Sequence, residues 1–193
     1  MNYPNELDQR LGKTGYGIWL HGTDRIYYSR PPLDSEGCVV LPNQDLSQVR
    51  ESLQPGKTPI VVTEQVEWLD EGEWSSLHAT AMAAVESWRN DWESGDVDRY
   101  LAHYARGFWS EGYDLNSWKA RKRRVARSKE YQKIDLHGVS IFAYPRTATD
   151  GQEMIVATFD QDYASNNYST QSRKRLYMVR EQGRWQVLYE GAI

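Results

Sequence analysis

The sequence LHATAMAAVESWRNDWESGDVDRYLAHY at residues 77–104 carries two helical patterns that a short break separates. In the first pattern the apolar residues recur every three or four positions, which places them on one face of a helix over residues 74–92. Ser94-Gly95 then ends this helix, and Asp96 is a suitable N-cap for the next one. The apolar residues of the second helix are expected to be Val97, Tyr100, Leu101 and Tyr104.

The residues that follow change to a different period. Asp114 is a suitable N-cap for a third helix, and from Ile134 onward apolar and polar residues alternate, which is typical of strands. Glu181-Gln182-Gly183 is expected to form a tight hairpin. We expect strands over residues 133–144, 153–163, 173–181 and 184–190.

Residues 1–68 differ from the rest because they are rich in Gly, Pro and short apolar runs. The expected elements of this region are strands at 17–20 and 60–62 and a helix at 45–53. Residues 38–41 are expected to form either another strand or the opening of a buried turn or helix. The sequence therefore predicts an α+β protein with two domains. The first is a mainly-β domain over residues 1–68, and the second packs three helices on a curved antiparallel sheet over residues 69–193.

The composition excludes several classes of protein. The 193 residues carry a formal net charge of −4, which argues against a dedicated nucleic-acid-binding protein. No apolar stretch approaches the roughly 18–20 residues that cross a bilayer. The residues after Met1 have neither the basic start nor the apolar core of a signal peptide. The single cysteine excludes an internal disulfide and a multi-cysteine zinc site, and we expect neither a metal nor a cofactor.

That cysteine, Cys38, follows Ser35-Glu36-Gly37 and precedes an apolar run. A glycine at this point allows a tight backbone that exposes the thiol and leaves nearby N–H groups free, and those are the parts of an oxyanion hole. A thiol needs a base at neutral pH, and His21 ends an apolar strand where an imidazole is both held and accessible. By default, however, a lone cysteine of this kind is a small core residue, and such a histidine caps a strand.

A resemblance connects these two residues. His21-Gly22-Thr23, followed after a spacer by Ser35-Glu36-Gly37-Cys38-Val39-Val40-Leu41, resembles the two-part signature of the L,D-transpeptidase catalytic domain (YkuD-like). The residues before His21 and the Arg30-Pro31-Pro32 segment in the spacer look like a subgroup of that family. The resemblance covers residues 1–68, which is the C-terminal part of such a domain.

The resemblance implies cysteine acyl-enzyme chemistry on a peptidoglycan stem tetrapeptide. Cys38 would be the nucleophile and His21 the base, with Gly37 framing the oxyanion and Ser35 supporting the loop. Substrate contacts would come from Gly22, Thr23 and Arg30. The acyl group would pass to an amine, as in a transferase, or to water, as in a carboxypeptidase or hydrolase. The same resemblance implies a location in the periplasm or cell envelope.

Two positions depart from the family pattern. Glu36 stands where the family usually has a second histidine, and Val40 stands near the place of an arginine in many members. Loss of that cation removes a partner for a substrate carboxylate, and Arg30 is a candidate to replace it. Since the family's preceding strands complete the sheet and one wall of the cleft, we expect the chain alone to have weak activity or none.

The second region resembles the cone-shaped domain of nuclear-transport-factor-2-like proteins, which include ketosteroid isomerase and SnoaL-type proteins. Residues 88–104 and the closing Gly183-Arg184-Trp185-Gln186-Val187 carry this resemblance. It implies a pocket between helices and sheet that takes a glycan or another envelope partner, and a dimer is possible. The whole arrangement resembles the subgroup of cell-shape-determining L,D-carboxypeptidases.

The ionisable candidates of the cone are on its strands, and we favour a solvated face for all of them. A basic run at 119–124 is likewise expected to be a solvated face rather than a nucleic-acid site. The candidates are Asp135, His137, Asp160 and Asp162, with Tyr144, Tyr163 and Tyr168 near the mouth. Three hypotheses follow: a peptidoglycan enzyme using Cys38, a non-catalytic envelope-binding module using the cone, and a small-molecule enzyme in the cone pocket.

Overall fold

The computed structural model describes residues 1–63 and 65–193 and divides them into two compact units, Met1–Thr58 and Pro59–Ile193. Helices and strands occur in both units, so the α+β fold class is confirmed. The domain boundary expected between residues 68 and 69 stays a prediction.

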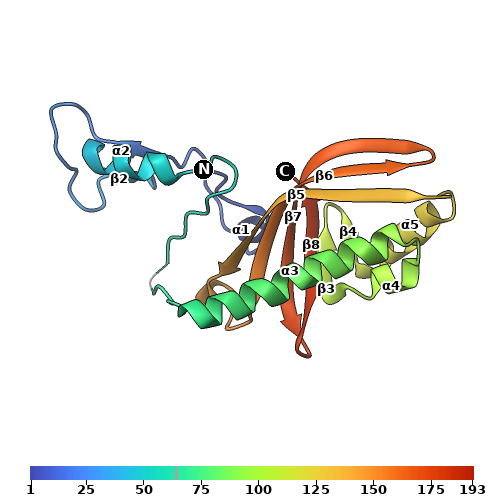
Figure 1. The fold of residues 1–193 in the computed structure, drawn as a ribbon. Coiled ribbons are helices and arrows are strands. Elements are labelled where there is room, and N and C mark those ends of the chain that lie inside the picture. Colours follow the sequence, from blue (N-terminus) through green and yellow to red (C-terminus); the bar gives the residue numbers. More distant parts are fainter. Residues whose placement is uncertain (64) are drawn as a thin grey trace. The chain divides into compact units, whose positions relative to one another are not determined.

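The first unit contains two short helices and two short strands (Figure 1). Its elements are α1 (Glu6–Arg10), β1 (Leu20–Gly22), β2 (Val39–Leu41) and α2 (Asn43–Ser52). β1 and β2 pair in parallel, with Leu20 opposite Val39 and Gly22 opposite Leu41. The helix expected at 45–53 is confirmed as α2, while the strand expected at 17–20 begins only at Leu20.

The second unit is a curved sheet of six strands with helices against one face (Figure 1). Its elements are α3 (Glu71–Glu93), α4 (Val97–Leu101), β3 (Tyr104–Ser110), β4 (Tyr113–Asp114), α5 (Leu115–Ala126), β5 (Gln132–Tyr144), η1 (Arg146–Ala148), β6 (Met154–Ser165), β7 (Tyr168–Glu181) and β8 (Arg184–Ala192). The strand order is β4-β3-β8-β7-β6-β5, and all neighbours are antiparallel except β3 and β8. The three expected helices and four expected strands are all present.

Local signals in the sequence explain where these elements begin and turn. Asp96 and Asp114 cap α4 and α5 as expected, because each carboxylate accepts a hydrogen bond from a backbone N–H in the first helical turn. The hairpin between β7 and β8 has positive φ at both Gln182 (51°) and Gly183 (77°). That pair of angles is the type I′ geometry whose twist suits a tight hairpin.

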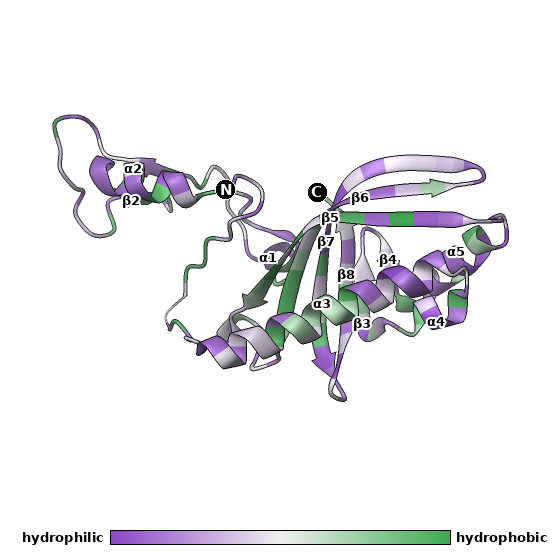
Figure 2. Cartoon of the chain, viewed as in Figure 1, coloured by the Kyte–Doolittle hydropathy of each residue, from purple (hydrophilic) through white to green (hydrophobic). Residues whose placement is uncertain are grey.

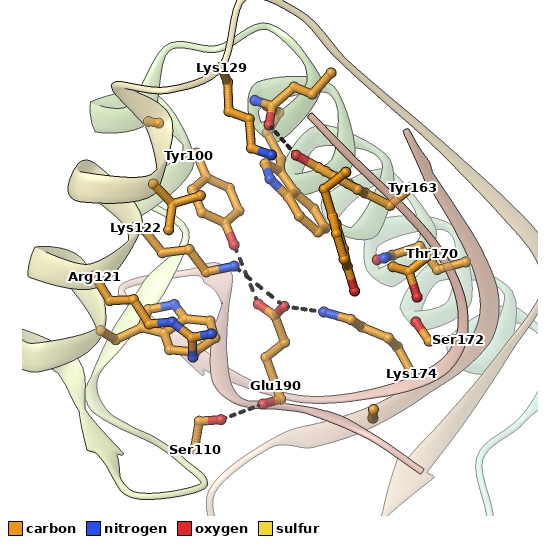
Figure 3. A pocket seen from close by; sticks show the side chains of 18 of the residues that line it. Tyr100, Ser110, Arg121, Lys122, Lys129, Tyr163, Thr170, Ser172, Lys174 and Glu190 are labelled. Atoms are coloured by element: carbon orange, nitrogen blue, oxygen red, sulfur yellow. Dashed lines mark hydrogen bonds and ion pairs between the residues drawn. The ribbon is translucent and has the colours of Figure 1, made fainter. Parts of the chain in front are cut away.

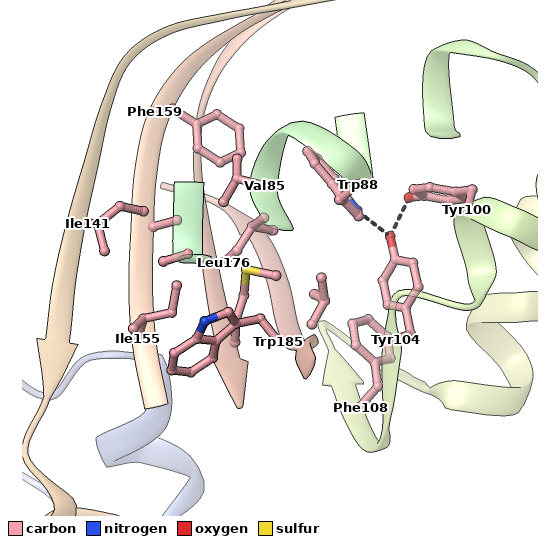
Figure 4. Close-up of a cluster of buried hydrophobic side chains, with 14 of the residues drawn as sticks. Val85, Trp88, Tyr100, Tyr104, Phe108, Ile141, Ile155, Phe159, Leu176 and Trp185 are labelled. Carbon is pink, nitrogen blue, oxygen red and sulfur yellow. Dashed lines mark hydrogen bonds between the residues drawn. The ribbon is translucent and has the colours of Figure 1, made fainter. Parts of the chain in front are cut away.

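The core lies between α3 and the concave face of the sheet. Ala81, Val85 and Trp88 on α3 are fully buried, and they meet inward side chains of the strands such as Ile155 and Leu176 (Figure 4). Figure 2 shows the corresponding contrast, since α3 carries apolar segments along its middle whereas α5 is mostly hydrophilic. Burial of this helix face therefore organises the second unit.

Two expectations about secondary structure were wrong. Tyr104 is not helical, because α4 ends at Leu101 and Tyr104 starts β3, a strand that the sequence did not reveal. Its helical spacing from Tyr100 concealed the change, since both rings point into the same core. Residues 60–62 also lie outside any strand, and Val62 is 84% exposed, so a β-branched run alone did not produce a strand.

We expect Leu176→Ala to lower the free energy of unfolding by about 2–5 kcal/mol, because the side chain is fully buried and its loss leaves a cavity. Urea titration followed by tryptophan fluorescence measures the change. Val62→Ala, at an exposed apolar position of the same unit, is the control and should differ from the wild type by less than about 0.5 kcal/mol. Equal effects of the two substitutions would contradict the assignment of the core.

Candidate functional site

The parallel register of β1 and β2 places Cys38 and His21 on one face. Val40 lies opposite His21, and side chains at alternate positions of a strand share a face. Cys38 immediately precedes β2, and the Val39 N–H donates to the Trp19 carbonyl, so the pairing continues to this point. Cys38 is therefore diagonal to His21 across the strand pair, although no hydrogen bond joins them in the described residues.

A backbone carbonyl orients the His21 ring. Nδ1 of His21 lies 2.7 Å from the Gly22 carbonyl oxygen, which can only accept a hydrogen bond. Nδ1 therefore carries the proton, and Nε2 is left as an acceptor. This is the tautomer that a general base needs in order to take a proton from a thiol.

The backbone around Cys38 is held in a tight turn. Ser35 Oγ donates to the Cys38 carbonyl at 2.7 Å, and Gly37 has φ of +116°. A Cβ at Gly37 would lie 2.7 Å from the Ile18 side chain, so this position requires glycine. Within the residues that the structure describes, the N–H groups of Gly37 and Cys38 make no backbone hydrogen bond. They are free to bind an oxyanion.

The remaining expected site residues lie around this turn. Cys38 itself is half-buried, with Sγ 3.8 Å from the Gly17 carbonyl oxygen. Gly22 ends β1, and Thr23 Oγ1 donates to the Tyr27 carbonyl at 2.8 Å. Arg30 pairs with Asp34 at 3.8 Å. Its guanidinium is therefore already next to a carboxylate, and both side chains are exposed to solvent.

The second unit contains a cavity of about 380 Å³ between α4, α5 and the open end of the sheet. Among the described residues, its walls combine aromatic rings, hydroxyl groups and several cations with two carboxylates, and Figure 3 shows cations gathered around one of them, Glu190. The second carboxylate is Glu111. The lining includes Trp92, Tyr100, Tyr113, Trp118, Arg121, Lys122, Lys129, Gln161, Tyr163, Tyr168, Lys174 and Glu190.

Glu190 is the centre of a buried ionic network in this cavity. The residue is 1% exposed, and Lys174 Nζ donates to its Oε1 at 2.6 Å. Lys122 Nζ lies 3.9 Å from the same oxygen, and the Tyr104 hydroxyl donates to Oε2 at 2.6 Å. Figure 3 shows the two lysines reaching the carboxylate from opposite sides.

Burial and charge shift the pKa values of this network in different directions. Burial by itself raises the pKa of Glu190, but the ammonium groups of Lys122 and Lys174 and the hydrogen bonds from Lys174 and Tyr104 outweigh it and lower the pKa to about 2. Burial lowers the pKa of Lys122 to about 8, and Glu190 opposes this effect. Burial, reinforced by Glu190, raises the pKa of the Tyr100 and Tyr104 hydroxyls. The cavity therefore holds a charged Glu190 at neutral pH.

Aromatic rings surround the two lysines. Lys122 Nζ lies 4.4 Å from the centre of the Trp118 ring and 4.8 Å from that of Trp92, and Lys174 Nζ lies 5.3 Å from Trp92. Such contacts stabilise an ammonium group through the ring face. Four cations of the described chain line the cavity and outnumber its two carboxylates, Glu111 and Glu190. The cations are Arg121, Lys122, Lys129 and Lys174. The cavity is therefore suited to an anionic ligand.

Two polar atoms in the cavity wall have no partner. Trp118 Nε1 and Gln161 Oε1 are buried and make no hydrogen bond with any residue that the structure describes. Both residues line the cavity, and they are 6% and 2% exposed respectively. An unsatisfied buried donor and acceptor are costly unless a bound group completes them.

The resemblance predicted a pocket in the cone, but the sequence analysis did not identify the charged residues that line it. Tyr163 and Tyr168 line the cavity as expected, whereas Tyr144 does not. None of the four strand candidates lines it, because alternation along β6 turns Gln161 and Tyr163 inward and turns Asp160 and Asp162 outward. Asp135 and Asp162 instead line a separate shallow depression with Lys133. The outward placement favoured for Asp135, His137, Asp160 and Asp162 agrees with their partial exposure.

The charged residues that the sequence analysis missed are Lys122, Lys174 and Glu190. Lys174 lies two residues before the buried Leu176 and four before the buried Met178, and alternate residues of a strand share a face. This alternation was the sequence signal that could have placed Lys174 inside the cone. Lys122 belongs to the basic run that was expected to be solvated, and its side chain is only 17% exposed. No sequence signal placed Glu190 inside, because a bulge between Tyr177 and Met178 changes the register of β8.

Among residues 1–63 and 65–193, none of the helices has the length and apolar character that crossing a bilayer requires. The same residues contain no group of three or more His, Cys, Asp or Glu side chains placed to bind a metal ion.

The fold and the cavity define a nuclear-transport-factor-2-like domain that follows a segment of an L,D-transpeptidase domain. The model of the Cds6 C-terminal NTF2-like domain matches residues 80–191, and the model of the L,D-transpeptidase catalytic domain (YkuD) matches residues 2–62. The chain belongs to the Cds6 C-terminal NTF2-like domain family. The expected resemblance to the cell-shape-determining subgroup is confirmed by solved structures that resemble the chain.

Solved structures of two proteins resemble the chain over nearly its whole length. Bd1075 of Bdellovibrio bacteriovorus is 28% identical with a TM-score of 0.77, and the match covers 100% of this chain and 68% of that one. The K307A mutant of the helical cell shape determining protein Pgp2 of Campylobacter jejuni is 26% identical with a TM-score of 0.79, covering 98% and 65%. The chain thus spans about two thirds of the length of these relatives.

A third structure resembles part of the chain in fold. An NTF2-like protein of unknown function from Pseudomonas putida is 14% identical with a TM-score of 0.50, and the match covers 61% of this chain and 86% of that one. No curated protein matches the sequence.

We expect Glu190→Gln to lower the free energy of unfolding at neutral pH by about 3 kcal/mol, because it leaves two buried ammonium groups without their counter-ion. The pKa of Glu190 is about 2 in the folded chain and has a usual value of 4.5. Between these values the unfolded chain binds more protons, so the stability of the wild type falls as the pH falls. The difference between wild type and variant should therefore shrink from pH 4.5 to pH 2, as measured by urea titration.

Glu153→Gln is the control for this experiment, because its carboxylate is partly exposed and pairs with Arg146 and Arg180 at the surface. We expect a change below about 1 kcal/mol for this variant. A stability difference for Glu190→Gln that stays constant with pH would contradict a charged, buried Glu190.

Proposed function

We propose that the chain carries the nucleophile segment of a peptidoglycan L,D-transpeptidase or L,D-carboxypeptidase, with Cys38 as nucleophile and His21 as base. The observation that carries this proposal is the hydrogen bond from His21 Nδ1 to the Gly22 carbonyl at 2.7 Å. It leaves Nε2 as an acceptor on the face of the strand pair that also bears Cys38. The match to the L,D-transpeptidase catalytic domain over residues 2–62 supports the same assignment.

In the proposed reaction, His21 Nε2 takes the thiol proton while Cys38 Sγ attacks the amide carbonyl before the terminal D-alanine of a stem tetrapeptide. The carbonyl oxygen becomes an oxyanion that the free N–H groups of Gly37 and Cys38 stabilise. His21 returns the proton to the leaving amine, and the C–N bond breaks to leave a thioester. An amine then accepts the acyl group in transpeptidation, and water accepts it in carboxypeptidation.

The surrounding residues have supporting parts in this proposal. Ser35 holds the turn through its hydrogen bond to the Cys38 carbonyl, and Gly37 supplies the backbone angle that a side chain would prevent. Gly22, Thr23 and Arg30 border the space where the substrate would lie. The exposed Arg30 is available to a substrate carboxylate if its pair with Asp34 opens. This function places the protein in the cell envelope, on the periplasmic side of a Gram-negative cell.

We expect a carbapenem to form a covalent adduct with Cys38, because this class of compound acylates an activated thiol. Intact-mass spectrometry should show one adduct per chain, absent from Cys38→Ala and formed about 100-fold more slowly in His21→Ala. This labelling reports on the thiol itself and does not require turnover of a peptide. An L,D-transpeptidase of full length is the positive control, and failure to label the wild type under conditions that label this control would contradict the proposal.

A second proposed function rests on observations in the cone cavity. We propose that this cavity binds an anionic ligand of the cell envelope, with a muropeptide as the candidate. Its excess of cations and aromatic walls supports this, as do the unpartnered Trp118 Nε1 and Gln161 Oε1. A ligand that accepts a hydrogen bond from the indole and donates one to the amide would satisfy both atoms.

Gln161→Met tests this binding function, because it removes the unpaired oxygen and keeps the length of the side chain. We expect unchanged or higher stability together with an affinity for a disaccharide tetrapeptide about tenfold lower, as measured by calorimetry. Arg121→Ala should weaken binding to a similar degree. The controls are Gln171→Met and Arg124→Ala, whose side chains do not line the cavity. Equal affinities for all four variants would exclude the cavity as the binding site.

A further inference from the structure

Asn43 lies beside the candidate base because of the register of the two strands. β1 and β2 are parallel with Gly22 opposite Leu41, and only Pro42 separates Leu41 from Asn43 at the start of α2. The chain therefore enters α2 next to the point where β1 ends. His21 is the residue directly before Gly22 at that end.

Two contacts connect the Asn43 side chain to the residues after His21. Asn43 Nδ2 donates to the Thr23 carbonyl at 3.0 Å. Asn43 Oδ1 packs so closely on Gly22 that a Cβ at this position would lie 1.9 Å from the oxygen. The amide therefore contacts Gly22 at its Cα and Thr23 at its carbonyl, one on each side of the peptide unit that joins these residues, and it leaves room only for glycine at position 22.

The same peptide unit orients the candidate base. Its carbonyl oxygen, that of Gly22, accepts the hydrogen bond from His21 Nδ1 at 2.7 Å. Asn43 fixes the two ends of this peptide unit, at the Gly22 Cα and at the Thr23 carbonyl, and so restricts how far its carbonyl can turn away from the ring. Leu46, also on α2, adds an apolar contact, since its Cδ2 would lie 3.4 Å from a Cβ at Gly22.

We propose that Asn43 is a positioning residue for His21: by fixing the Gly22 Cα and the Thr23 carbonyl, on either side of the peptide whose carbonyl meets the ring, it keeps the proton on Nδ1 and leaves Nε2 as the acceptor. The catalytic consequence rests on the proposed reaction of Cys38. The tautomer of His21 is a property of the folded chain and can be measured whether or not Cys38 reacts.

Long-range ¹H–¹⁵N spectra of the uniformly labelled chain test this positioning, because they distinguish Nδ1–H from Nε2–H in each neutral imidazole. The chain has four histidines, and His21→Gln assigns the signal of interest. We expect the wild type to show the Nδ1–H form, and Asn43→Ala to lower the ratio of Nδ1–H to Nε2–H by about three- to tenfold. A wild-type ring in the Nε2–H form, or an unchanged ratio in Asn43→Ala, would overturn the inference.

Two further variants separate positioning from a general loss of structure. Asn43→Asp keeps the side-chain shape and adds an acid to the first turn of α2, which favours the helix, but it removes the donor to Thr23. We expect the tautomer ratio to fall in Asn43→Asp while thermal unfolding stays close to that of the wild type. Gln44→Ala, at the neighbouring exposed position of α2, should leave the ratio unchanged. A fall of the same size in Gln44→Ala would show that any disturbance of α2 suffices and would overturn the assignment to Asn43.

The pH profile of Cys38 alkylation by iodoacetamide then connects the ring to the thiol, and the single cysteine makes the reading unambiguous. We expect the rate in Asn43→Ala to fall toward that of His21→Ala below the pH at which a free thiol ionises, by about three- to tenfold. Equal rates in wild type and His21→Ala would contradict the proposed function, while the tautomer ratio would still decide the role of Asn43. A full rate in Asn43→Ala beside a reduced rate in His21→Ala would contradict the inference alone.

Discussion

Burial of one face of α3 against the concave side of the six-stranded sheet is the interaction on which the second unit depends. Ala81, Val85 and Trp88 exclude water from the inner side of the strands, and the apolar area that they remove from water supplies the main driving force. This packing fills one end of the cone. The other end, under α4 and α5, holds the cavity, which aromatic rings and charged side chains line.

The open end shows how a buried charge can be retained. Glu190 loses its hydration, and two ammonium groups and a tyrosine hydroxyl replace the water. The rings of Trp92 and Trp118 stabilise the ammonium groups in turn. The groups of this network bind one another, whereas Trp118 Nε1 and Gln161 Oε1 in the same wall have no hydrogen-bond partner among the described residues. The surplus of cations and the unpaired polar atoms support the proposed ligand-binding role of the cavity.

The first unit achieves its geometry with very little regular structure. Two strands of three residues each bring the histidine segment and the cysteine segment together, although the spacer between them is a long loop. Glycine at positions 22 and 37 permits the close approaches that a side chain would block. The resulting site depends on backbone carbonyls and amides, and its precision therefore follows from the short parallel pairing and from the start of α2.

The sequence was enough to predict the α3 helix, the caps at Asp96 and Asp114 and the hairpin at Gln182-Gly183, because periodicity and capping are local properties. Cys38 and His21 became paired candidates through the resemblance to the L,D-transpeptidase motif. Which charges enter the cone could not be predicted in this way, because that depends on the tertiary fold. A bulge in the pairing of β7 with β8 turns Glu190 inward. Lys122, on α5 in a distant part of the sequence, then lies close to its carboxylate. The strand that begins at Tyr104 was likewise invisible, because a parallel pairing with β8 involves residues far apart in sequence.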